Sequence, residues 1–167
     1  MDISKSIALI VIGVVGVLIV ILEIQLILRR FKKTDEDGRL NISYGVWFTF
    51  LIIAALTIML HTTAILNEAV DIIYKNESSS KIKDVAKTST LLIGFSALWF
   101  FVCFFISGYL STVFVGKRSD QNEINTNNIS YFLIKGSLLT SLILCLTTAF
   151  EKILRSFIPS IQIPFYH

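Results

Sequence analysis

The stretch LLIGFSALWFFVCFFISGYLSTVFV, from Leu91 to Val115, decides the fold of this chain. It runs for 25 residues without a charged side chain. The hydrocarbon core of a bilayer is about 30 Å thick, and an α-helix needs about 20 apolar residues to cross it. Barrel strands alternate between apolar and polar residues, whereas this run is continuous. It therefore indicates a membrane-spanning helix, whose backbone groups are all satisfied within the segment.

Three further runs have the same character. They cover residues 7–28, 44–66 and 131–150. Glu23 interrupts the first run, His61 the second and Lys135 the third. We predict an all-α integral membrane protein with four transmembrane helices, a single domain over residues 1–167 whose main partner is the lipid bilayer.

The composition supports this class. The chain is 54% hydrophobic and 16% charged, with a mean hydropathy of +0.73. These values exclude a disordered chain and an ordinary soluble domain. The net charge of +3 is too small to indicate an acidic partner, so we expect no binding to nucleic acid.

The first apolar run is expected to stay in the protein. Its 22 residues exceed the apolar core of a signal peptide, which is about 7–15 residues long. The basic sequence RRFKK, residues 29–33, follows where a small-residue cleavage site would lie.

Positive charges orient the chain. The first and third loops hold seven Lys and Arg residues between the spans, and the other side also holds seven. The basic cluster at 29–33 and the pair Lys117 and Arg118 directly follow spans, whereas Glu68 and Asp71 open the second loop. We therefore predict that loops 1 and 3 are cytoplasmic and that both termini lie outside.

The second loop, residues 67–90, keeps apolar residues at helical spacing. The second and third helices are therefore predicted to project beyond the membrane as a hairpin that turns at residues 76–80. The alternative is an amphipathic loop that lies on the headgroups.

Two short motifs recur along the chain: NISY at Asn41–Tyr44 and Asn128–Tyr131, and TTA at 62–64 and 147–149. The offsets are 87 and 85 positions. Nearly equal offsets predict two tandem helical hairpins, and the two copies would insert the same way round, with a pseudo-two-fold axis along the membrane normal. The alternative is convergence, because Asn and Ser suit a helix N-cap and Tyr suits the membrane interface.

The predicted repeats cover about residues 1–75 and 80–159. Asn41 followed by Gly45, and Asn128 followed by Gly136, resemble the helix starts of an uncharacterised bacterial inner-membrane family called domain of unknown function 350. The resemblance implies a multi-pass protein of the cell inner membrane built from two tandem two-helix repeats. It implies no reaction.

Glu23 and Lys135 form a candidate intramembrane polar pair. Glu23 lies five residues before the end of the first span, and Lys135 lies four residues after the start of the fourth, on the same side. Both would sit at a depth of about 6–8 Å by the rise of a helix. The alternative is that Lys135 extends to the headgroups while Glu23 faces water or a neighbouring subunit. His61 lies deeper and is expected to make a helix–helix polar contact.

The sequence shows no catalytic or metal-ligating pattern. Cys103 and Cys145 stand singly among apolar residues, and His61 has no second ligand at helical spacing. We therefore expect no enzyme and no cofactor. Small residues suit close helix packing, namely Gly13, Gly16, Gly94, Ser96, Ala97, Gly136, Ser137, Thr140 and Ser141.

These features favour a non-enzymatic membrane protein that assembles into an oligomer, as a scaffold or a channel-like accessory subunit. Its partner would be a second copy or another membrane protein. Two alternatives remain: a membrane-embedded immunity or defence factor, and a small dimeric transporter with Glu23, His61 and Lys135 as coupling groups. The aromatic third helix is expected to face lipid or another subunit. The chain after Pro159 is expected to leave the last helix.

Overall fold

The computed structural model describes residues 3–31, 34, 38–75 and 81–158. The helices are α1 (Ile3–Leu28), α2 (Ile42–Lys75), α3 (Lys81–Val115), α4 (Asp120–Asn125) and α5 (Ile129–Arg155). The four longer ones are long and apolar enough to cross a membrane. They contain the four apolar runs of the sequence, so the predicted fold class is confirmed.

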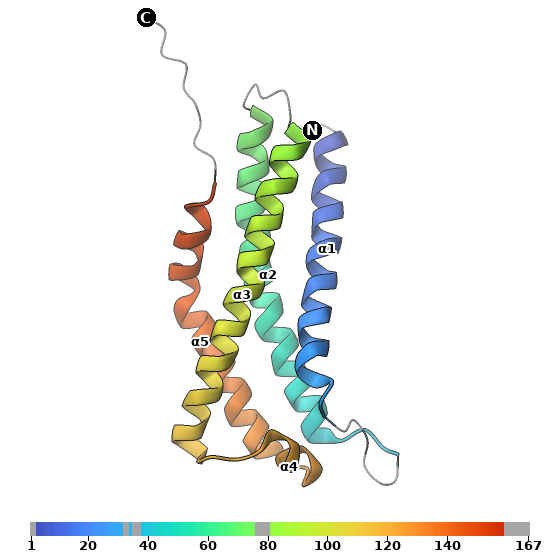
Figure 1. Cartoon of the computed structure of the whole chain (residues 1–167), viewed down its shortest axis with the longest axis vertical. Coiled ribbons are helices and arrows are strands. Elements are labelled where there is room, and N and C mark those ends of the chain that lie inside the picture. Colours follow the sequence, from blue (N-terminus) through green and yellow to red (C-terminus); the bar gives the residue numbers. More distant parts are fainter. Residues whose placement is uncertain (1–2, 32–33, 35–37, 76–80, 159–167) are drawn as a thin grey trace, which may run out of the picture.

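The long helices stand side by side as an elongated bundle (Figure 1). α1 and α3 run in one direction, and α2 and α5 run in the other. α1 packs on α2 and α3 at one edge, and α5 packs on the same two helices at the opposite edge. The short α4 lies across the end at which α2 and α5 begin.

α2 and α3 are longer than a membrane requires. At 1.5 Å per residue, the 34 residues of α2 span about 50 Å. The helices continue through the polar stretch up to Lys75 and from Lys81 onwards, as predicted, while their projection beyond the membrane stays a prediction. Its turn, residues 76–80, lies outside the described residues.

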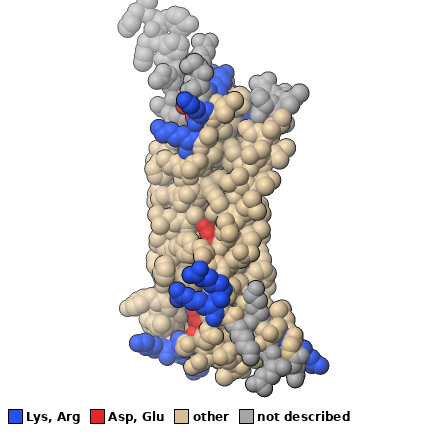
Figure 2. Space-filling model, turned by 45° about the vertical axis from the view of Figure 1, so that its right-hand side comes forward, with Lys and Arg blue, Asp and Glu red and all other residues tan. Residues whose placement is uncertain are grey.

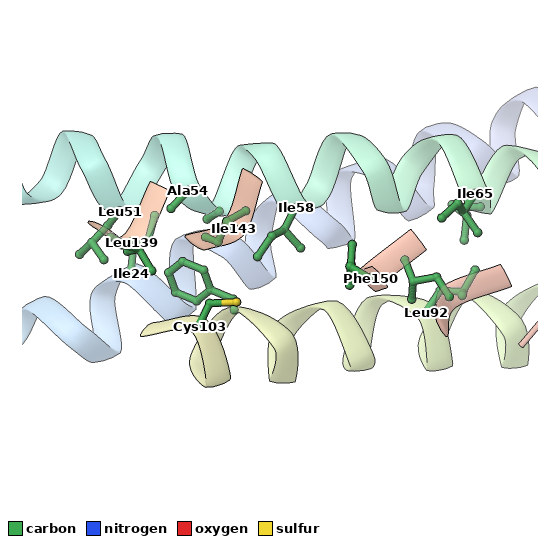
Figure 3. Packing of buried hydrophobic residues seen from close by; sticks show 14 of the residues in the cluster. Ile24, Leu51, Ala54, Ile58, Ile65, Leu92, Cys103, Leu139, Ile143 and Phe150 are labelled. Carbon is green, nitrogen blue, oxygen red and sulfur yellow. The ribbon is translucent and has the colours of Figure 1, made fainter. Parts of the chain in front are cut away.

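The core lies where α2, α3 and α5 meet, with α1 closing one side. Figure 3 shows Leu51 and Ala54 of α2 beside Leu139 of α5, with Cys103 of α3 and Ile24 of α1 close by. Leu51, Ala54, Cys103 and Leu139 have no exposed surface. Because lipid is as apolar as these side chains, close contact rather than exclusion of water holds the helices together.

Small residues serve two different purposes. A Cβ atom at Gly136 would lie 2.2 Å from Cγ of Phe50, so α5 approaches α2 where only glycine fits. Gly13 has nothing near it, and Ser137 and Ser141 face outwards. The predicted packing role therefore holds inside the bundle for Gly136, whereas Ser137 and Ser141 lie on the outer surface.

Figure 2 shows a wide band almost free of charged side chains between two charged ends, and many exposed apolar residues lie on the outer surface. The aromatic side chains of α3 divide between the core and this band. Phe100 is buried, whereas Phe105 and Tyr109 are about 70% exposed. The second half of α3 thus carries exposed aromatic side chains, and whether they face lipid or another subunit stays a prediction.

Two further features of the fold are a short helix in the third loop and the end of the last helix. The third loop, for which no helix was predicted, contains α4, because Asp120 and Glu123 favour a helix start. The last helix ends at Arg155, before Pro159. The predicted tail itself, residues 159–167, lies outside the described residues.

Candidate functional site

The most heavily bonded polar cluster centres on Lys135 of α5. Only 6% of this residue is exposed. Its Nζ lies 2.6 Å from each carboxylate oxygen of Asp120, at the start of α4. Tyr131 donates from Oη to Oδ1 of Asp120, also at 2.6 Å. Asp120 therefore neutralises the buried ammonium and receives three hydrogen bonds.

An aromatic wall completes the surroundings of this ammonium. Nζ of Lys135 lies 5.1 Å from the ring centroid of Trp47 and 5.7 Å from that of Tyr131. Both distances suit cation–π attraction. The ammonium of Lys135 is paired with a carboxylate that accepts two of its hydrogen bonds. The cluster is therefore suited to holding α4 over α2 and α5 rather than to reacting with a substrate.

A second pair of contacts fixes α4. Glu123 receives hydrogen bonds from Arg118 at 3.2 Å and from the side chain of Asn128 at 2.5 Å. Ile124, which is buried, faces the bundle. This helix was not predicted from the sequence, although Ser119 followed by acidic residues is a recognisable helix start.

The predicted pair between Glu23 and Lys135 is not formed. Lys135 is taken by Asp120, and Oε1 of Glu23 has no hydrogen-bond partner within the described residues. Helical rise predicts a similar depth for both residues but does not predict the direction in which each side chain points around the bundle. α1 and α5 lie at opposite edges, with α2 and α3 between them (Figure 1).

The two NISY motifs meet at one end of the bundle. α2 begins at Ile42 and α5 at Ile129, the same position of each motif. Asn41 accepts from the backbone N–H of Ser43 at 3.0 Å, and its amide donates to the carbonyl of Ile124 at 2.5 Å. Both motifs thus place an asparagine at a helix start.

Asn127 and Asn128 complete this junction. Oδ1 of Asn127 accepts from the backbone N–H and from the hydroxyl of Ser43, both at 3.0 Å. Asn128 caps α5 by accepting from the backbone N–H of Tyr131 at 3.3 Å. Capping is a local reason for each NISY sequence, while descent from a duplication stays a prediction.

The side chains of Tyr44 and Tyr131 are both buried, but their partners differ. Tyr131 binds Asp120, whereas the ring of Tyr44 stacks on Phe48 with centroids 6.5 Å apart. The TTA motifs differ in the same way. Thr62 is within 2.7 Å of the hydroxyl of Ser96 on α3, whereas Thr147 bonds within its own helix.

His61 makes the expected contact between helices. Its Nδ1 lies 2.6 Å from Oε1 of Glu151 on α5. Arg155 of α5 also pairs with Glu68 of α2. Glu151 was missed because it lies one residue beyond the predicted span 131–150.

The described residues contain no group of three or more His, Cys, Asp and Glu side chains that would hold a metal ion. Cys103 is buried and Cys145 is exposed, each as a free thiol. No family model, no curated protein and no solved structure matches this chain.

Proposed function

We propose that this chain is a non-enzymatic, multi-pass membrane protein whose copies associate within the membrane as a scaffold or a channel-like accessory subunit. The observation that carries the proposal is the outward direction of Ser137 and Ser141 on α5. Together with Leu133, Ile134 and Leu138 they line a shallow groove. Small residues four apart let a second helix approach closely in lipid.

α1 offers a similar notch at the opposite edge. Gly13 forms its floor, with Ile10, Val14, Val17 and Leu18 around it. A Cβ atom at Gly13 would meet nothing within 4 Å, so no side chain of the described residues fills the notch. Two small-residue grooves at opposite edges favour association of one copy with the next.

The interior of the bundle supports this role over that of a pore within one chain. Trp47, Leu51, Phe132 and Leu139 are fully buried at the centre. Any conducting path would then run between copies. The polar clusters around Lys135 and His61 join helices, which suits a rigid building block.

Molecular mass in detergent tests the proposal. We expect one defined oligomer larger than a dimer. A dimer would support the small transporter instead, and a monomer would support the immunity or defence factor. Replacing Ser137 and Ser141 together by Leu should shift the mass towards the monomer, whereas Thr112→Leu, at another exposed small residue, should not.

We also propose that the protein resides in a bacterial inner membrane with loops 1 and 3 cytoplasmic, and that it belongs to the family of domain of unknown function 350. The basic flanks of the spans and the asparagine-led helix starts support these proposals. In a variant without Cys103 and Cys145, cysteine introduced by Thr34→Cys should resist an impermeant thiol reagent added outside intact cells, and cysteine from Lys81→Cys should react. The reverse labelling would invert the orientation.

A further inference from the structure

Glu23 is a buried acid that the contacts described so far do not explain. Only 6% of this residue is exposed. Its Oε1 is inaccessible to solvent and has no hydrogen-bond partner in the described part of the chain. The residue lies on the side of α1 that faces α2 and α3, within the apolar span.

The side chain borders a small cavity between these three helices. The cavity has a volume of about 10 Å³, which is at the lower limit for holding one water molecule. Ala55 and Ile58 of α2 and Phe100 of α3 form apolar parts of its wall. Ser96 is its other polar side chain, and its hydroxyl is already engaged with the carbonyl of Leu92 and with Thr62.

The charges around this cavity do not balance a carboxylate. None of the side chains that line it is a Lys, Arg or His. On α3 the nearby titratable group of the core is the Cys103 thiol, which is uncharged at neutral pH. Lys135 is bound to Asp120, and His61 to Glu151. A carboxylate left in apolar surroundings without a counter-charge is strongly disfavoured, whereas the neutral acid is not.

We propose that Glu23 is a proton-binding site inside the membrane-spanning bundle, occupied by a proton when α1 packs as observed. To bind, a carboxylate oxygen takes a proton from a hydronium ion and releases water, and no other bond changes. α1 is the least buried of the four long helices, so it is the element that can move to admit water for exchange. This site is independent of the proposed assembly.

A membrane-soluble carbodiimide tests the proposal in the full-length protein in detergent or vesicles. The reagent takes the proton of a neutral carboxyl on its nitrogen, and the carboxylate oxygen then adds to its central carbon. We expect an adduct at Glu23, located by mass spectrometry of peptides. Its rate of formation should fall about tenfold per pH unit once the carboxyl ionises.

Two variants and a second reagent make the result decisive. Glu23→Gln should remove the adduct, and Glu151→Gln should retain it. Glu23→Asp keeps a carboxyl at this position should the glutamine variant fail to fold. A water-soluble carbodiimide should label the exposed Glu68 but not Glu23. Absence of the hydrophobic adduct at Glu23, or a rate that does not change with pH, would overturn the proposal.

Discussion

Lys135 of α5 and Asp120 of α4 form an ion pair in which Nζ of the lysine lies 2.6 Å from each carboxylate oxygen of the aspartate. The lysine side chain is 7% exposed and the aspartate side chain 27%. Removing either partner leaves the charge of the other without a counter-charge. The loss of stability should be smaller when the aspartate remains, because water reaches the aspartate more easily than the lysine.

Asp120→Asn should therefore lower the free energy of unfolding by about 3 kcal/mol, since it leaves a buried ammonium with one neutral acceptor. Lys135→Met should cost less. In the double variant the losses should fall short of their sum by about 1 kcal/mol or more. The measurement is a denaturation series in mixed detergent micelles, and additive losses would contradict the pairing.

The same series tests the geometry of α1. Glu23→Gln and Lys135→Met should give losses that add within about 0.5 kcal/mol, because the two residues share no partner and lie at opposite edges of the bundle. A coupling larger than that would place α1 against α5 and refute the arrangement of Figure 1.

Glu23 and Lys135 also show which structural features can be predicted from the sequence. Apolar length predicts each span, and helical rise predicts the depth of a residue in it. Neither contains the direction in which a side chain points around the bundle, so Glu23 and Lys135 were paired although other helices separate them. The pairing of Asp120 with Lys135 was not predicted, because the helix of Asp120 has only six residues, too few for a periodic pattern.

Gly136→Ala should destabilise the protein more than any other glycine-to-alanine change in the spans. The new Cβ would meet Cβ of Phe50 at 2.7 Å as well as its ring, so the two helices must separate. We expect a loss of about 1–3 kcal/mol. Gly94→Ala is the matched control, because nothing lies near that position. Gly16→Ala should lie between, since the flexible end of Met59 can move. Equal effects at Gly136 and Gly94 would refute the close contact.

The asparagine caps should differ in importance. Asn41→Ala removes the cap of α2 and the hydrogen bond to Ile124, so we expect a loss of about 2 kcal/mol. Asn128→Ala should cost less, about 1 kcal/mol, because the cap bond to Tyr131 is long at 3.3 Å and Glu123, which loses the amide of Asn128, keeps its contact with Arg118. Asn41→Asp keeps an acceptor but not the donor and should lie between. If the Asn41→Asp variant is as stable as the wild type, the hydrogen bond to Ile124 does not contribute to stability.

His61 and Glu151 should contribute little compared with Lys135 and Asp120, although their distance of 2.6 Å is the same. The side chains are 35% and 36% exposed, so water or headgroups can replace each partner. A double-mutant cycle of His61→Phe and Glu151→Gln should give a coupling below about 1 kcal/mol. The pair Glu68 and Arg155, which joins the same helices but is more exposed, serves as the control and should couple still less. A His61 coupling as large as that of Lys135 would instead show that α2 and α5 exclude water at this level.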